Sequence, residues 1–389
     1  MATFSDLPNE LITDIWVHVI EPEDVESFAL VSKNVHALST RFVKEHCDLK
    51  KQYSKISVSR RLGSRGAADL LKEILLNPRI ALYINELRIL DCIDRWGKQN
   101  PPFTVNTMDL FKNAIRHSTI IAPTEMGDWI ADLELGNEDP IVALIVMQRH
   151  LTKLEKFEID YLDTIADQYM IETLGRITLS SEAIILPGSS APESKIDSKK
   201  EIGLPRPAVF SNLSALTIRW FDIPLDIISR LLRSASELKS LSYNGSAEPF
   251  QICNMLLECH QHSLQELYFN TYNPRERRLC DLCDFTRFEV LTDLKIRFCL
   301  LLGSDEKAYK ALADVLPMSI ERLTLYYAEN TRKVVSEMVK SKIKRMPNLK
   351  ALILNLDTDG SRHTNLFTEL QAKSAEVGVL LSKRPFSTY

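Results

Sequence analysis

Six cysteine and histidine side chains cluster between residues 253 and 283, and their chemistry is the most distinctive in the chain. They are Cys253, Cys259, His260, His262, Cys280 and Cys283. The Cys280-x-x-Cys283 spacing is compatible with zinc, but no second pair matches it, so Cys259 and His262 would have to complete the site. Cys253 and Cys259 lie on the apolar side of a predicted helix, where cysteine usually behaves as a small hydrophobic residue. We therefore expect no metal and no other cofactor.

Other signatures of catalysis or nucleic-acid binding are missing from the sequence. It contains no glycine-rich phosphate loop, no His-Glu-x-x-His and no Gly-x-Ser-x-Gly elbow. The basic run Arg275, Arg277 and Arg278 is interrupted by Glu276, and the net charge of the chain is −4. Nucleic-acid binding usually needs clustered basic residues, so we expect no nucleic-acid partner. We expect a non-enzymatic protein. An alternative is a metal-dependent or hydrolytic enzyme with its site in residues 54–210.

Composition places the chain among soluble globular proteins. It has 389 residues, of which 45% are hydrophobic and 26% are charged. No apolar stretch is long enough to span a bilayer, and the first residues do not resemble a signal peptide. Seven scattered cysteines indicate reduced thiols. We expect a cytoplasmic and/or nuclear protein that does not contact membranes.

Three short helices are predicted in the first fifty residues. Apolar residues from Leu11 to Ile20 recur on one helix face within residues 8–20, and Pro22 ends that helix. A second helix follows Pro22, and Ser32 is a suitable N-cap for a third. Three small helices cannot easily bury all of their apolar side chains against one another. Either the rest of the chain or a partner is expected to cover the surplus.

This segment resembles the F-box family. The matching positions are Leu7-Pro8, Glu10-Leu11, Ile15, Pro22, Asp24, Phe28, Leu30-Val31 and Ser32-Lys33. Ser32 and Val35 stand where the family often has Cys and Trp. The resemblance implies binding to the Skp-type adaptor of a cullin–RING ubiquitin ligase, and through the adaptor to a cullin. By position, the adaptor-binding residues would be Leu7, Pro8, Leu11, Ile15, Phe28, Val31 and Val35.

A pattern of three apolar positions, separated by two residues and then one, recurs through the rest of the chain. Six copies begin at Leu213, Leu238, Leu264, Leu291, Ile320 and Leu349, at steps of 25 to 29 residues. Two weaker copies begin at Ile84 and Leu154, and helical patterns lie between the copies. A strand plus a helix at this period is typical of leucine-rich repeats. The Asn or Cys ladder of that family is mostly absent, since only Cys299 fits it.

We therefore expect an α/β fold, with an N-terminal three-helix F-box followed by an irregular leucine-rich-repeat-like solenoid that has a strand and a helix in each repeat. The F-box would occupy residues 1–50, a helical linker residues 51–79 and the repeat domain residues 80–389. Within the repeat domain we expect an irregular part at 80–210 with a mobile loop at 187–207, regular repeats at 211–360 and a C-terminal cap at 361–389.

Alternate strand residues in such repeats face a concave surface, which predicts a target-binding face. Its candidate residues are Arg219, Glu266, Tyr268, Asp293, Lys295, Arg297, Arg322 and Tyr326, with Asn244, Asn270 and Asn355 on the same face. Tyr and Arg with mixed charge suit a protein partner. The expected function is that of a substrate-recognition subunit of a Skp–cullin–F-box ubiquitin ligase, which binds an unknown protein target. An interaction scaffold with no degradative role is an alternative.

Overall fold

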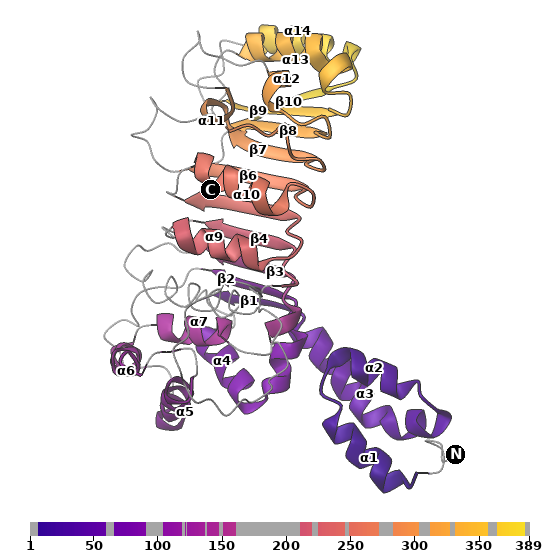
Figure 1. Cartoon of the computed structure of the whole chain (residues 1–389), viewed down its shortest axis with the longest axis vertical. Helices are drawn as coiled ribbons and strands as arrows, with labels where there is room; N and C mark the ends of the chain where they lie inside the picture. The colour runs from indigo at the N-terminus through magenta and orange to yellow at the C-terminus, as the bar shows by residue number, and fades with distance from the viewer. Residues whose placement is uncertain are drawn as a thin grey trace, which may run out of the picture. The chain divides into compact units, whose positions relative to one another are not determined.

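The chain folds into two compact units, residues 1–212 and 213–389, and is mixed α/β, with ten parallel strands among the residues that the structure describes (Figure 1). The computed structural model describes residues 7–59, 66–90, 104–118, 121, 123–136, 138–147, 151–160, 211–219, 225–245, 249–271, 283–302, 312–326, 331–356 and 364–385. The predicted loop at 187–207 and the basic run at 275–278 lie outside these residues.

The first unit begins with a bundle of three helices, α1 (Asn9–His18), α2 (Pro22–Ala29) and α3 (Lys33–Tyr53). Trp16 forms its centre, with its ring 4.7 Å from that of Phe28 and 5.3 Å from that of Phe42. Ile12, Val25 and Ala29 are buried around it. The predicted cap is confirmed, because the Val35 backbone N–H donates to Ser32 Oγ at 3.2 Å.

Three parallel strands follow in the same unit, in the order β1-β2-β3. The bounds of the elements after α3 are β1 (Lys55–Ser59), α4 (Ala67–Leu76), η2 (Pro78–Tyr83), β2 (Glu86–Leu90), α5 (Val105–Arg116), α6 (Met126–Glu134), α7 (Asp139–Val146), η3 (Leu151–Lys153) and β3 (Lys156–Asp160). Strand β1 lies within residues 51–79, which the sequence predicts to be a helical linker. It pairs in register with β2 because Ile56 and Val58 stack on Leu87 and Ile89.

The second unit contains seven parallel strands in chain order. Its elements are β4 (Ala215–Arg219), α9 (Leu225–Ser234), β5 (Ser240–Gly245), α10 (Pro249–His260), β6 (Glu266–Thr271), β7 (Asp293–Arg297), α11 (Phe298–Leu302), α12 (Leu312–Val315), β8 (Arg322–Tyr326), α13 (Thr331–Arg345), β9 (Ala351–Leu356), α14 (Thr364–Glu376) and β10 (Leu380–Pro385). Helix α14 and strand β10 lie in the segment expected as a cap, and β10 pairs with β9 like any other strand.

Apolar ladders hold the strands of the second unit in register. Every position of the eight recurring apolar patterns is buried. From β4 to β9, one ladder consists of Leu216, Leu241, Leu267, Leu294, Leu323 and Leu352, and a second of Ile218, Tyr243, Phe269, Ile296, Leu325 and Leu354. Since side chains alternate along a strand, the residues between these positions face the opposite side of the sheet.

The ladders predict an asymmetry between adjacent positions of β7. Leu294 is fully buried between Leu267 and Leu323, whereas Lys295 is exposed. Leu294→Ala should lower the free energy of unfolding by about 2–5 kcal/mol, because it leaves a cavity in a packed ladder. Lys295→Ala is the control and should change it by no more than about 0.5 kcal/mol. Urea denaturation followed by circular dichroism measures both, and equal losses would contradict the packing described.

Candidate protein-interaction surfaces

Exposed apolar side chains concentrate on the three-helix bundle. Those between residues 11 and 31 are Leu11, Val17, Ile20, Leu30 and Val31, with exposed fractions of 46–80%. Elsewhere in the described chain, exposed large apolar residues stand far apart in sequence, as at Leu76, Val105 and Met318. Local concentration of such residues is typical of a surface that another protein covers. We call residues 7–31 with these five side chains the bundle surface.

The structure separates the predicted adaptor-binding residues into three groups. Pro8, Leu11 and Val31 are exposed, and Leu7, Ile15 and Phe28 are half-buried at the edge of the bundle. Val35 is fully buried, so the prediction that it contacts a partner is corrected. Val35 lies in the first turn of α3, where its backbone is capped by Ser32, and its side chain belongs to the core that contains Trp16.

Three exposed residues of the bundle surface were not predicted as contacts. Val17, Ile20 and Leu30 are 64%, 46% and 80% exposed. Leu30 is the most exposed of the five because it follows the last residue of α2 and precedes the Ser32 cap. The available signal was the surplus of apolar residues over what three helices can bury, rather than any one motif position.

Polar contacts fix the bundle to the rest of the first unit. His46, which is buried on α3, lies 3.1 Å from Glu26 on α2 and 3.1 Å from the Tyr83 hydroxyl on η2. Lys50 donates to the same Glu26 carboxylate at 2.7 Å, and Lys153 pairs with Glu23 at 2.9 Å. The hydrogen bond from Lys50, followed by that from His46, lowers the pKa of Glu26. These contacts engage Glu23 and Glu26, which lie within residues 7–31, and they do not involve the five exposed apolar side chains of the bundle surface.

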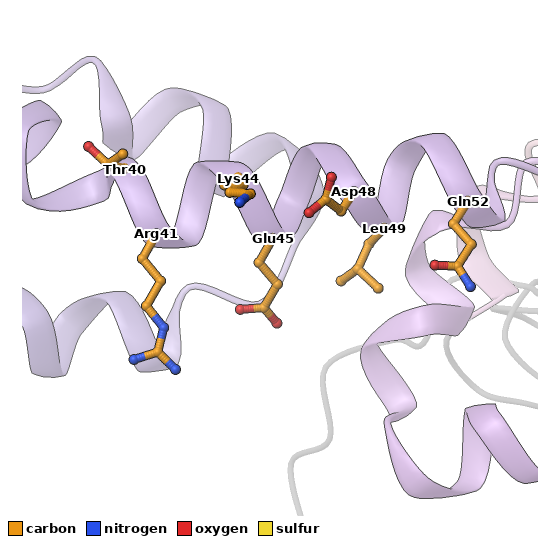
Figure 2. Close-up of a pocket in the computed structure, with 7 residues that line it drawn as sticks. All are labelled: Thr40, Arg41, Lys44, Glu45, Asp48, Leu49 and Gln52. Carbon is orange, nitrogen blue, oxygen red and sulfur yellow. The ribbon is translucent and has the colours of Figure 1, made fainter.

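A shallow hollow runs along α3 (Figure 2). In Figure 2 its side chains project from successive turns of this one helix; they are Thr40, Arg41, Lys44, Glu45, Asp48, Leu49 and Gln52. Two basic and two acidic residues balance each other, and Arg79 lies 3.5 Å from Glu45. Groups that converge from several elements are usual in an enzyme active site. A row on one helix does not provide that convergence, so we assign no catalytic role to the hollow.

The solvent-facing side of strands β4 to β9, which we call the sheet face, carries the predicted target-binding residues. Arg219, Glu266, Lys295 and Arg322 are exposed, and Tyr268, Arg297 and Tyr326 are half-buried. Asp293 differs from the prediction because it is 7% exposed. Its carboxylate accepts from Arg322 Nε at 3.0 Å and lies 3.9 Å from Lys295 Nζ. Asp293 therefore orients neighbouring cations and presents little surface to a partner.

Tyrosine and arginine side chains gather around Tyr268 on the sheet face. The Tyr268 and Tyr326 rings lie edge to face with centroids 5.7 Å apart, and Arg297 Nε donates to Asn270 Oδ1 at 2.6 Å. Burial raises the pKa of Tyr268, while hydrogen bonds with Asn270 and Tyr326 and the charges of Arg219 and Arg297 oppose that rise. Alternation along the strands predicts that Tyr268, Arg297 and Tyr326 share one face. The structure places Tyr268 against Tyr326 and Arg297 against Asn270 on that face.

The equivalent face of the first unit is occupied by its own ion pairs. Glu86 on β2 accepts from Lys55 on β1 and from Lys156 on β3, each at 3.0 Å, and its side chain is 14% exposed. Arg88 pairs with Glu158 at 3.2 Å. The hydrogen bonds from Lys55 and Lys156 lower the pKa of Glu86. Ion pairs therefore connect all three of these strands.

The cysteine and histidine residues singled out above do not gather around a common point in the described chain. No group of three or more Cys, His, Asp or Glu side chains there is placed to hold a metal ion, and Cys280 lies outside the described residues. His262 pairs with Glu289 at 2.9 Å. Cys253 and Cys283 are buried, and their mutual hydrogen bond, followed by burial, raises the pKa of the Cys253 thiol.

Two comparisons with known proteins identify no relative of this chain. A scan against protein-family models gives no match, and a search of curated proteins finds none with significant similarity. Among the helices that the structure describes, none combines the length and apolarity required to cross a bilayer.

The charge cross-link at Glu86 predicts a pH-dependent stability. Glu86→Gln should lower the free energy of unfolding at pH 7 by about 1 kcal/mol, since partly exposed ion pairs contribute up to about that much. The pKa of Glu86 is lower in the folded chain than in the unfolded chain. Ionised Glu86 therefore stabilises the fold at pH values above its unfolded-state pKa, and this stabilisation is lost as the pH falls through its folded-state pKa. The difference in free energy of unfolding between Glu86→Gln and wild type should therefore become smaller below about pH 4.

Urea denaturation at pH 7, 5 and 3.5 measures this difference. Glu376→Gln is a matched control, because Glu376 is an exposed carboxylate at the end of α14. The control should track wild type at every pH. A difference between Glu86→Gln and wild type that stays constant or grows on acidification would refute the cross-link.

Proposed function

We propose that this chain is a substrate-recognition subunit of a Skp–cullin–F-box type ubiquitin ligase. The bundle surface would bind the Skp-type adaptor, and the sheet face would bind a protein target. The chain would contribute no acid, base or nucleophile. Its role would be positioning, since holding the target beside the ubiquitin-conjugating enzyme raises the effective concentration of the reacting groups.

The observation that carries this proposal is the exposure of the bundle surface. Leu30 is 80% exposed and Val17 is 64% exposed, in a bundle whose centre is well packed around Trp16. Burying an aliphatic side chain of this size is worth about 1.5–3 kcal/mol, so its cost in water favours a bound partner. The exposed set includes Leu11 and Val31, which are also positions of the F-box resemblance.

A second feature supports the division of roles. The bundle surface lies in the first unit and exposes large aliphatic side chains among acidic residues, whereas the sheet face lies in the second unit and presents Arg and Tyr side chains. Two chemically different surfaces suit two different partners, a constant adaptor and a variable target. An interaction scaffold with no degradative role would use the same two surfaces. Turnover of the bound target in cells distinguishes the two functions.

Co-expression with a Skp-type adaptor, followed by size-exclusion chromatography, tests the adaptor half of the proposal. We expect wild type to form a one-to-one complex. Leu11→Ala/Val31→Ala should raise the dissociation constant at least tenfold, because both apolar side chains are half-exposed and would be buried by the adaptor.

The matched control is Leu76→Ala/Met318→Ala, which removes two other exposed apolar side chains that lie outside the bundle surface. It should bind like wild type. Failure of the folded wild type to form a complex, or equal weakening by both double variants, would overturn the adaptor assignment.

A further inference from the structure

Six polar side chains form one row across the sheet face, at the carboxyl ends of strands β4 to β9. In strand order they are Arg219, Asn244, Asn270, Arg297, Tyr326 and Asn355. Neighbouring strands lie about 4.8 Å apart, so the row extends for about 24 Å. An extended peptide advances about 3.3 Å per residue, so about seven residues would span it. We call this set the polar row.

Two acceptors in the polar row have no hydrogen-bond partner among the residues that the structure describes. Asn244 is 6% exposed, and its Oδ1 is buried and unpaired. The Oδ1 of Asn355, four strands away, is also buried and unpaired. Leaving a buried acceptor unsatisfied costs about 1–3 kcal/mol, so both atoms favour a ligand that supplies donors. Main-chain N–H groups of an extended peptide are such donors, and the asparagine Nδ2 groups can in turn donate to its carbonyls.

The charges of the sheet face indicate the charge of the ligand that it would prefer. On the described strands β4 to β9 it carries Arg219, Lys295, Arg297 and Arg322, against the carboxylates of Glu266 and Asp293. Asp293 is engaged by Arg322 at 3.0 Å, and the polar row itself contains two arginines and no acid. The chain as a whole has a net charge of −4, so this face is locally positive on an acidic protein. An acidic ligand complements it.

We propose that the polar row binds an extended segment of a protein partner, about seven residues long, that carries aspartate or glutamate side chains. Asn244 and Asn355 would bind its main chain, Arg219 and Arg297 its carboxylates, and the Tyr268–Tyr326 pair would pack against its aliphatic groups. The proposal rests on the proposed function, because it specifies the class of target that such a receptor would recognise.

Selection from a random library of displayed twelve-residue peptides on the full-length chain tests this proposal. We expect the peptides recovered on wild type to be enriched in Asp and Glu and depleted in Lys and Arg. A selected peptide, measured by fluorescence anisotropy, should bind Arg219→Ala/Arg297→Ala at least tenfold more weakly. Asn244→Ala should weaken binding severalfold and leave the acidic preference of a repeated selection unchanged, because it removes a main-chain contact.

The matched control is Lys340→Ala/Lys344→Ala, which removes two exposed cations from α13 outside the sheet face. Binding equal to wild type is expected. Recovery of no peptides, an unbiased pool, or equal losses in both double variants would overturn the proposal. Tighter binding of a twelve-residue oligothymidine to the same face would also overturn it, in favour of a nucleic-acid ligand.

The adaptor experiment above separates failure of this proposal from failure of the proposed function. If the chain binds the adaptor but selects no acidic peptides, the receptor proposal stands and only the polar-row proposal fails. If it selects acidic peptides but binds no adaptor, only the polar-row proposal stands.

Discussion

In-register stacking of parallel strands is the constraint on which the second unit depends. Leucine at the same position of successive strands, from Leu216 to Leu352, forms one continuous ladder. A slip of one residue would turn every side chain of a strand to the other face. The ladders therefore fix the positions of the solvent-facing residues as firmly as those of the core. The contact between Asn270 and Arg297, from strands 27 residues apart in sequence, follows from that register.

The three-helix bundle obeys a different constraint, which is its small size. The rings of Trp16, Phe28 and Phe42 fill its centre. Little interior remains in which three short helices could bury their other apolar side chains. Val17 and Leu30 consequently stay in water. Because His46, Glu26 and Tyr83 tie the bundle to its own unit, the exposed residues are held on a fixed support. Exposed apolar side chains that are already in place bind a partner without a large ordering cost.

The three-position pattern predicted the strands at the copies that were recognised. Strand β1 was missed although Tyr53, Ile56 and Val58 have the same spacing and are buried. Strand β10 was missed because Lys383 stands opposite Leu354, where the pattern requires an apolar residue. It nevertheless pairs in register, since the neighbouring strand supplies the template that its own sequence lacks.

The candidate surfaces were predictable to the extent that alternation decides which way a side chain points. The facing directions of Lys295 and Arg322 follow from the pattern alone. Burial of Asp293 does not, because it depends on contacts with Lys295 of the same strand and Arg322 of the next. Burial of Val35 likewise depends on how α3 packs across α1 and α2, which helical periodicity does not specify. The unpaired Oδ1 of Asn244 could be found only in the structure.

Hydrogen exchange of the full-length chain, with and without a saturating Skp-type adaptor, would show whether the bundle surface binds the adaptor. We expect added protection from exchange in residues 9–31, where the exposed apolar side chains lie, and none in strands β4 to β9. No added protection anywhere would contradict it, and so would protection confined to the strands.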